Sequence, residues 1–269
     1  MSDEIETKLS AARTRLILDK PFLGALVLRL PMERGNPSWC KTTATDAKTF
    51  YYNEEYIQGL SLEQTQFILA HEALHCALSH FARRQHRVKH RWDLACDFAI
   101  NPILVKDGFT PTPDALYQDI YEDMTAEEIY PMLDDNEDQQ TEDQHIYDEE
   151  NEQDQDDSDS QQGGQSQQES DGDRPNNEAE LDQEMGGAPQ PQSLTEEEKD
   201  QLSVQWQQRM AGAAQQAMQA GKLSGAMARM VDHLLQPQLP WRMLLARYMT
   251  AVARDDYNYS RPSRREGQA

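Results

Sequence analysis

Two histidines and one glutamate in the pentapeptide His71-Glu72-Ala73-Leu74-His75 have the types and spacing of a catalytic zinc site. On a helix, residues i and i+4 lie on one face, so both imidazoles can bind one Zn²⁺. Glu72 can then act as general base toward a water molecule in the metal's remaining position. The pattern predicts peptide-bond hydrolysis by metal-activated water. The simpler interpretation is an amphipathic helix with two surface histidines.

A second polar pattern follows in residues 92–105, which are mostly apolar except at Asp93, Asp97 and Asn101. These three residues are four positions apart and therefore share one stripe of a helix. A buried carboxylate is costly unless it is paired or binds a metal. Because a catalytic zinc needs a third protein ligand, we predict Asp97 as that ligand and Asp93 as the alternative. The other aspartate would hydrogen-bond the free nitrogen of a ligand histidine.

His80 adds a third histidine after the motif, but the predicted helix directs it away from the metal. A capping box at residues 61–64 begins a helix that we expect to run to about Ala82. At about 100° per residue, His80 lies about 140° round this helix from His75. A chain turn that would return a third histidine to the metal needs a glycine, which residues 77–79 lack. We therefore expect a structural role for His80.

The acidic residues are concentrated in one segment of the 269-residue chain. The chain has a net charge of −23, and residues 134–185 contribute −20 of it, with 21 acidic residues and one basic residue. A segment with so few apolar residues does not offset the entropy cost of becoming ordered. We therefore predict a disordered acidic linker at 134–194, between a domain at 1–133 and a C-terminal helical segment at 195–269.

Composition also limits the class of protein. The apolar runs are far shorter than the roughly 20 residues of a membrane-spanning helix. The negative net charge disfavours nucleic acid as a partner. The first residues do not have the pattern of a secretory signal. Three cysteines without CxxC spacing indicate free thiols in a reducing compartment, so we expect a cytoplasmic protein.

The predicted elements give an α+β fold, in which a small antiparallel sheet accompanies a mainly helical domain. Strands are expected at 22–30 and 42–52, which are rich in apolar, aromatic and β-branched residues. Helical spacing of apolar residues and capping boxes predict the helices. Their expected ranges are 3–18, 61–82, 92–105, 126–133, 195–219, 226–235 and 241–254.

Several of these segments together resemble a known family. The chain resembles the bacterial putative metallopeptidase domain that usually precedes a von Willebrand A-like domain. The similarity covers both predicted folded parts and skips the linker. It is carried by residues 69–80, Arg83-Arg84, 92–101, 126–130, 221–223, 241–245 and 256–265.

The resemblance implies a zincin-like fold in which His71, His75 and a downstream aspartate bind the metal. Because the family often has Asn at the position of Asp93, it favours Asp97 as the ligand. Relatives are often encoded near an AAA+ ATPase of the MoxR type, which implies such a partner. The chain ends at Ala269, where the A-like domain would begin, so we expect either loss of that domain or a fragment of a longer protein.

Two functions compete for the predicted zinc site. The first is a zinc metallopeptidase acting on a peptide or protein, with the substrate strand paired to the edge of the sheet. Tyr117 or Tyr121 would then be a candidate to stabilise the oxyanion. The second is a non-enzymatic, zinc-containing adaptor that works with the AAA+ ATPase. Glu72 distinguishes them, because a structural site does not need a general base.

A third hypothesis concerns the cations between residues 83 and 91. They could contact nucleic acid, although a solvated turn between two helices is the more common role of such a run. The acidic linker could also bind this turn and restrict access to the helix that carries the motif. The cations are Arg83, Arg84, Arg87, Lys89 and Arg91.

Overall fold

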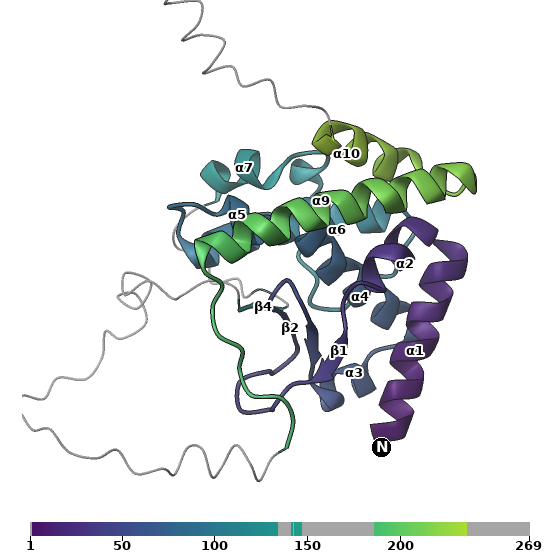
Figure 1. The fold of residues 1–269 in the computed structure, drawn as a ribbon, viewed down its shortest axis with the longest axis vertical. Helices are drawn as coiled ribbons and strands as arrows, with labels where there is room; N and C mark the ends of the chain where they lie inside the picture. Colours follow the sequence, from purple (N-terminus) through teal and green to yellow (C-terminus); the bar gives the residue numbers. More distant parts are fainter. Residues whose placement is uncertain (1, 134–140, 142, 147–185, 236–269) are drawn as a thin grey trace, which may run out of the picture. The chain divides into compact units, whose positions relative to one another are not determined.

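The computed structural model describes residues 2–133, 141, 143–146 and 186–235 (Figure 1). The chain divides into two units, 1–234 and 235–269, and the second falls almost wholly outside the described residues. The predicted α+β class is confirmed, since helices predominate and accompany one four-stranded sheet. The predicted helix at 241–254 and most of the predicted linker lie outside the described residues.

Nine α-helices and two short 3-10 helices are present among the described residues. Ser61 and Thr195 cap helices α4 and α9, each through a capping box. The α-helices are α1 (Ser2–Asp19), α2 (Pro21–Val27), α3 (Glu54–Gly59), α4 (Leu62–Ala77), α5 (His80–Arg83), α6 (Lys89–Lys106), α7 (Ala126–Ile129), α9 (Glu196–Gln219) and α10 (Gly225–Leu235). The 3-10 helices are η1 (Asp119–Tyr121) and η2 (Tyr130–Met132).

The sheet is mixed, whereas we expected an antiparallel one. Its order is β1-β3-β2-β4, in which β2 and β3 are antiparallel while β1 with β3 and β2 with β4 are parallel. The predicted strand at 42–52 is in fact the hairpin of β2 and β3. The strands are β1 (Met32–Arg34), β2 (Thr43–Thr45), β3 (Phe50–Tyr52) and β4 (Gln144–His145).

The predicted strand at 22–30 is wrong, because this segment begins with helix α2. Pro21 occupies the first turn, where its fixed φ favours a helix. A Cβ at Gly24 would lie only 2.5 Å from Cα of Ile17, so glycine allows α2 to approach α1 closely. A short apolar run is buried on all sides in either conformation, which is why its pattern did not distinguish them.

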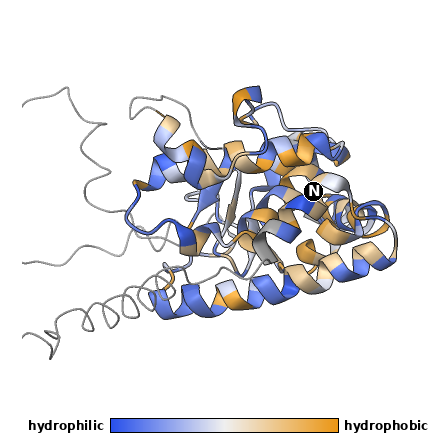
Figure 2. Cartoon of the chain, turned by 90° about the horizontal axis from the view of Figure 1, so that it is seen from above, coloured by the Kyte–Doolittle hydropathy of each residue, from blue (hydrophilic) through white to orange (hydrophobic). Residues whose placement is uncertain are grey.

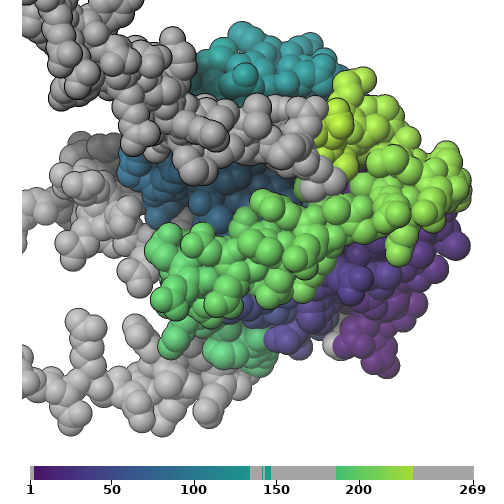
Figure 3. Space-filling view, turned by 45° about the horizontal axis from the view of Figure 1, so that its top comes forward, coloured from purple at the N-terminus to yellow at the C-terminus, as the bar shows by residue number. Residues whose placement is uncertain are grey.

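The largest hydrophobic core joins α1, α2, α4 and α9. In Figure 1 α9 runs across the helical part of the molecule, and it packs against α2, α4 and α5. The space-filling view shows α9, in green, lying beside the purple N-terminal helices (Figure 3). The helices carry both hydrophobic and hydrophilic residues, as expected of helices that bury one face (Figure 2). No described helix has the length and apolar composition needed to cross a membrane.

Trp206 connects α9 to the sheet and provides a test of this packing. Its side chain is fully buried, and its Nε1 donates a hydrogen bond of 2.9 Å to the carbonyl oxygen of Ala47 in the turn between β2 and β3. We expect Trp206→Ala to lower the free energy of unfolding by about 3–5 kcal/mol, measured by urea denaturation. Val204→Ala is the matched control on the exposed side of α9 and should change it by less than about 0.5 kcal/mol. Equal effects of the two substitutions would show that α9 is not part of this core.

Candidate metal centre

The two motif histidines lie on α4 and direct one nitrogen each to the same point. The Nε2 atoms of His71 and His75 are 3.0 Å apart, and both side chains are fully buried. Burial lowers the pKa of His75 well below its usual range, and the charge of His145 lowers it further. The His75 imidazole is therefore neutral, which is the form that binds metal ions.

Asp97 on α6 reaches the same point from the neighbouring helix. Its Oδ1 lies 3.2 Å from Nε2 of His75 and 3.7 Å from Nε2 of His71. The side chain is 1% exposed. The structure therefore brings together the three side chains that the sequence analysis selected as metal ligands.

Asn101, one turn further along α6, orients the first histidine. Nδ1 of His71 lies 2.8 Å from Oδ1 of Asn101, whose Nδ2 donates to the carbonyl oxygen of Leu116 at 2.9 Å. Because Nδ2 of Asn101 donates to Leu116, its Oδ1 faces His71 and accepts a hydrogen bond from Nδ1–H. This tautomer of His71 has its lone pair on Nε2, where a metal can bind. The sequence predicts an aspartate of the stripe, and not Asn101, as the hydrogen-bond partner of the ligand histidine. Asp93 instead lies 3.1 Å from Nδ1 of His145 and 3.4 Å from Nζ of Lys89.

His80 lies beside the cluster, although the continuous helix predicted to Ala82 is wrong. Helix α4 ends at Ala77, and Ser79 adopts a left-handed conformation with φ of 54° before α5 begins. The chain thus turns after the motif without a glycine, and Ser203 on α9 donates a hydrogen bond to the hydroxyl of Ser79. The turn places Nδ1 of His80 3.2 Å from Nδ1 of His75, on the side of that ring opposite the metal-facing Nε2.

Two further members of the cluster, Asp143 and His145, come from the segment predicted as a linker. Oδ2 of Asp143 lies 3.7 Å from Nε2 of His71 and 3.0 Å from Nε2 of His145. The His145 ring packs against that of His75, with centroids 4.3 Å apart. Sequence reasoning missed both residues. The available signal was the apolar pair Ile146-Tyr147 directly after the one histidine of the acidic segment.

Burial and neighbouring charges alter the acidity of these groups. Burial raises the pKa of Glu72 well above its usual range, and the charge of Asp143 raises it further. The same two causes raise the pKa of Asp97. Burial also raises the pKa of Asp143, but the charge and hydrogen bonding of His145 outweigh this effect and leave the pKa well below its usual range. Burial lowers the pKa of His145, but the charge of Asp143 outweighs it and the net shift is strongly upward.

The arrangement fits a metal ion. Four of the six distances among one atom each of His71, His75, Asp97 and Asp143 are 3.0–3.7 Å. Ligand atoms placed tetrahedrally at about 2.0–2.1 Å from zinc are about 3.3 Å apart. The carboxylate oxygens of Glu72 and Asp97 are buried without a hydrogen bond of acceptable geometry. Buried carboxylates in this state are costly, and a bound cation would offset that cost.

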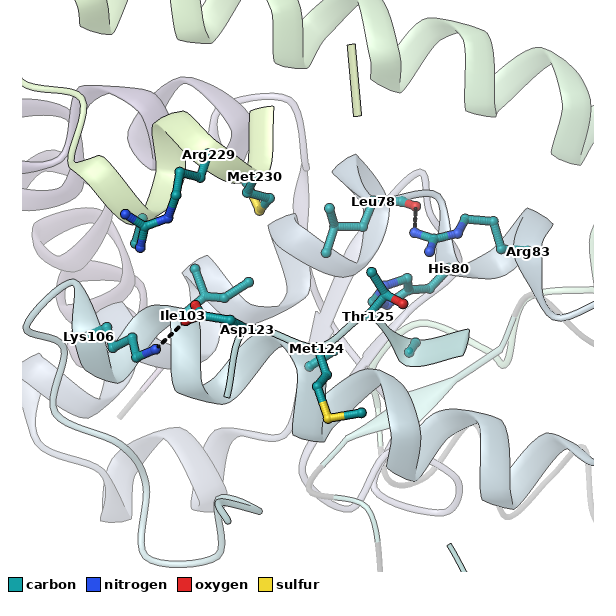
Figure 4. A pocket seen from close by; sticks show the side chains of 13 residues that line it. Leu78, His80, Arg83, Ile103, Lys106, Asp123, Met124, Thr125, Arg229 and Met230 are labelled. Carbon is teal, nitrogen blue, oxygen red and sulfur yellow. Dashed lines mark hydrogen bonds and ion pairs between the residues drawn. The ribbon is translucent and has the colours of Figure 1, made fainter. Parts of the chain in front are cut away.

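A cavity of about 450 Å³ borders the cluster at His80 (Figure 4). Its apolar walls include Leu78, Ile103 and Met230, and its polar side includes Lys106, which pairs with Asp123 at 3.1 Å. Among the described residues that line it, His80 alone belongs to the cluster. The cavity therefore reaches the outer side of the cluster and not the atoms that face the metal position.

The cations between residues 83 and 91 contact groups of the chain itself. Arg83 pairs with Glu127, and its Nε donates at 2.9 Å. The guanidinium groups of Arg87 and Arg91 lie over aromatic rings, 4.9 Å from the centroid of Trp92 and 4.5 Å from that of Tyr130. These contacts are consistent with a packed turn between helices. The partner expected for the turn, the acidic segment, lies mainly outside the described residues.

The two tyrosines considered for the oxyanion make other contacts. The Tyr117 hydroxyl donates a hydrogen bond of 2.9 Å to Oε1 of Glu122 near the surface. The ring of Tyr121 packs against Phe98, with centroids 4.8 Å apart. Cys40, Cys76 and Cys96 are buried free thiols, so the expectation of no disulfide among them is confirmed.

Comparison with known proteins identifies a family over nearly the whole chain. The model of a family described as "Putative metallopeptidase domain" matches residues 4–268. No curated protein and no solved structure matched the chain. The family match and the His/Asp cluster together support a metal-dependent function.

Proposed function

Because the chain belongs to this family of metallopeptidase domains, we propose that it is a zinc-dependent peptidase. In this proposal His71, His75 and Asp97 bind the zinc and Glu72 is the general base. The nitrogen and carboxylate donors are those that zinc takes in hydrolytic sites. The observation that carries the proposal is Glu72, a fully buried carboxylate without a hydrogen bond of acceptable geometry, next in sequence to His71, whose Nε2 converges with Nε2 of His75 and Oδ1 of Asp97.

Zinc in this position would supply a Lewis acid that polarises a carbonyl and lowers the pKa of water to about 7. The remaining work belongs to the protein's own groups. Asn101 holds His71 in the tautomer whose Nε2 carries the lone pair needed to bind a metal. Burial of Glu72 raises the pKa of its carboxyl group, so that this group can both accept a proton from water and return it to the leaving amine.

The second candidate function is a non-enzymatic, zinc-containing adaptor. Asp143 favours it, because a fourth protein ligand would close the site in the way that structural zinc sites are closed. In that case Glu72 has no chemical role. The partner would be the MoxR-type AAA+ ATPase expected from the resemblance, and a cytoplasmic location is part of this proposal for either function.

Metal removal tests the proposed function. We expect the purified full chain to contain about one zinc and to cleave unstructured peptides in a library analysed by mass spectrometry. Dialysis against a chelator should abolish cleavage, and zinc should restore it. Zinc at about 1,000 times its dissociation constant should also raise the free energy of unfolding by about 4 kcal/mol.

Two results would count against a zinc peptidase. A chain that binds no zinc would exclude both candidate functions. A chain that binds zinc but cleaves no peptide, even with the metal site saturated, would favour the adaptor.

A further inference from the structure

The proposed function does not explain how a substrate reaches the buried cluster. The side chains of His71, His75, Asp97, Asp143 and His145 are 0–1% exposed. The neighbouring cavity reaches only His80 (Figure 4). Within the described part of the chain these ligand atoms are thus covered in this conformation, and we infer that a covering element moves before a substrate binds.

Strand β4 is the part that covers the cluster from the side of the sheet. It lies at the sheet edge next to β2, with Ala44 opposite Gln144 and Thr45 opposite His145. Side chains alternate along an extended strand, so Asp143 and His145 face the cluster while Gln144 is exposed. This is how an extended peptide binds to a sheet edge, with its backbone on the strand and alternate side chains in the site.

Strand β4 is short, and buried charge contacts hold it as well as backbone bonds: Asp93 lies 3.1 Å from Nδ1 of His145, and Oδ2 of Asp143 lies 3.7 Å from Nε2 of His71. Beyond the strand pairing, the amide of Ile146 donates a hydrogen bond of 3.0 Å to the carbonyl oxygen of Thr45. The Ile146 side chain packs in a small cluster with Cys40, Ala44 and Tyr51. Opening of β4 therefore breaks a short backbone pairing together with these buried charge contacts.

We propose that the edge of β2 is the peptide-binding edge of the site and that residues 143–146 occupy it as an intramolecular substitute for substrate. Asp143 then stands where water and the substrate carbonyl would be, so the folded chain is latent until β4 leaves. This inference rests on the proposed function, because it requires a metal with one exchangeable position. Glu72 supports an exchangeable position, since a permanently closed site gives its buried carboxylate no role.

A probe of the free coordination position tests the inference without measuring catalysis. The full chain is loaded with Co²⁺ in place of zinc and titrated with acetohydroxamate, a small bidentate metal ligand, while the Co²⁺ absorption spectrum is recorded. If β4 is closed about nine-tenths of the time, the apparent dissociation constant is about tenfold above that of the open site. We therefore expect Asp143→Ala and Asp143→Asn to bind acetohydroxamate about tenfold more tightly than the unchanged chain.

A second variant removes the strand without changing a candidate ligand. Ile146→Ser weakens the packing of β4 and should also tighten acetohydroxamate binding several-fold. Gln144→Ala is the matched control, because Gln144 lies on the same strand with an exposed side chain. It should leave the dissociation constant unchanged.

The outcomes separate this inference from the proposed function. Loss of Co²⁺ from Asp143→Ala would make Asp143 a permanent ligand and overturn the inference. Equal acetohydroxamate binding by the unchanged chain, Asp143→Asn and Ile146→Ser would also overturn it, while the metal site itself would stand. Failure of the unchanged chain to bind any metal would instead refute the proposed function, and the inference with it.

Discussion

Replacing Glu72 by glutamine is expected to slow peptide cleavage by roughly 10²–10⁴-fold, the usual contribution of a general base, while one zinc stays bound. The amide has the size of the carboxylate but does not accept a proton from water at neutral pH. Glu72 lies within the group that also contains Asp143 and His145, whose atoms are within 4.8 Å of one another, and its oxygens are buried without a hydrogen bond of acceptable geometry. Initial rates on one peptide, together with zinc content by mass spectrometry, measure both effects.

Stability distinguishes a chemical effect from a folding defect. In the metal-free chain, glutamine replaces a carboxyl group whose charged form is costly to bury, so we expect the free energy of unfolding to stay equal or to rise. Glu63→Gln is the matched control, because Glu63 lies on the same helix with an exposed side chain that pairs with Arg15. A Glu72→Gln chain that cleaves as fast as the unchanged chain would remove Glu72 from the mechanism.

The local part of the site could be predicted because it depends on spacing within single helices. His71 and His75 are one turn apart on α4, and Asp97 and Asn101 are one turn apart on α6. A polar residue that repeats every four positions in an apolar segment predicts a buried polar stripe wherever the helix packs. The exact partner of each stripe residue depends on the position of α6 along its axis relative to α4, which is why Asn101 and not Asp93 contacts His71.

The non-local part could not be predicted. Asp143 and His145 reach the site through a pairing with β2, which lies about a hundred residues earlier in the chain. Their own segment is acidic and poor in apolar residues, so its composition predicts a linker. His145 lies between the carboxylates of Asp143 and Asp93. This charge pairing forms only when β4 and α6 are in place.

Two backbone features also depended on tertiary contacts. Helix α2 is favoured over a strand by its close approach to α1 at Gly24, which no pattern within residues 22–30 indicates. The turn at Ser79 has a positive φ that a sequence without glycine does not suggest. Contact between Ser79 and Ser203 on α9 accompanies this conformation, and α9 is more than a hundred residues away in sequence.

Zinc binding by single alanine variants is expected to separate the ligands from their neighbours. His75→Ala and Asp97→Ala should lose zinc on dialysis, because each removes a donor atom that faces the metal position. Asp93→Ala should retain it through the same dialysis, because Asp93 contacts no side chain of the proposed ligand set. Asp93 contacts His145 and Lys89, so its effect on the metal is indirect.

The controls decide between this ligand set and its alternative. His86→Ala removes an exposed histidine of the turn before α6 and should leave zinc binding unchanged. Urea denaturation of each metal-free variant shows whether zinc is lost from a folded chain, which the assignment of Asp97 requires. Full zinc content in folded Asp97→Ala, together with loss from Asp93→Ala, would transfer the third ligand position to Asp93. The two residues are one turn apart on the same face of α6, so that result would also require α6 to be shifted along its axis by about 6 Å from the arrangement in which Asn101 meets His71.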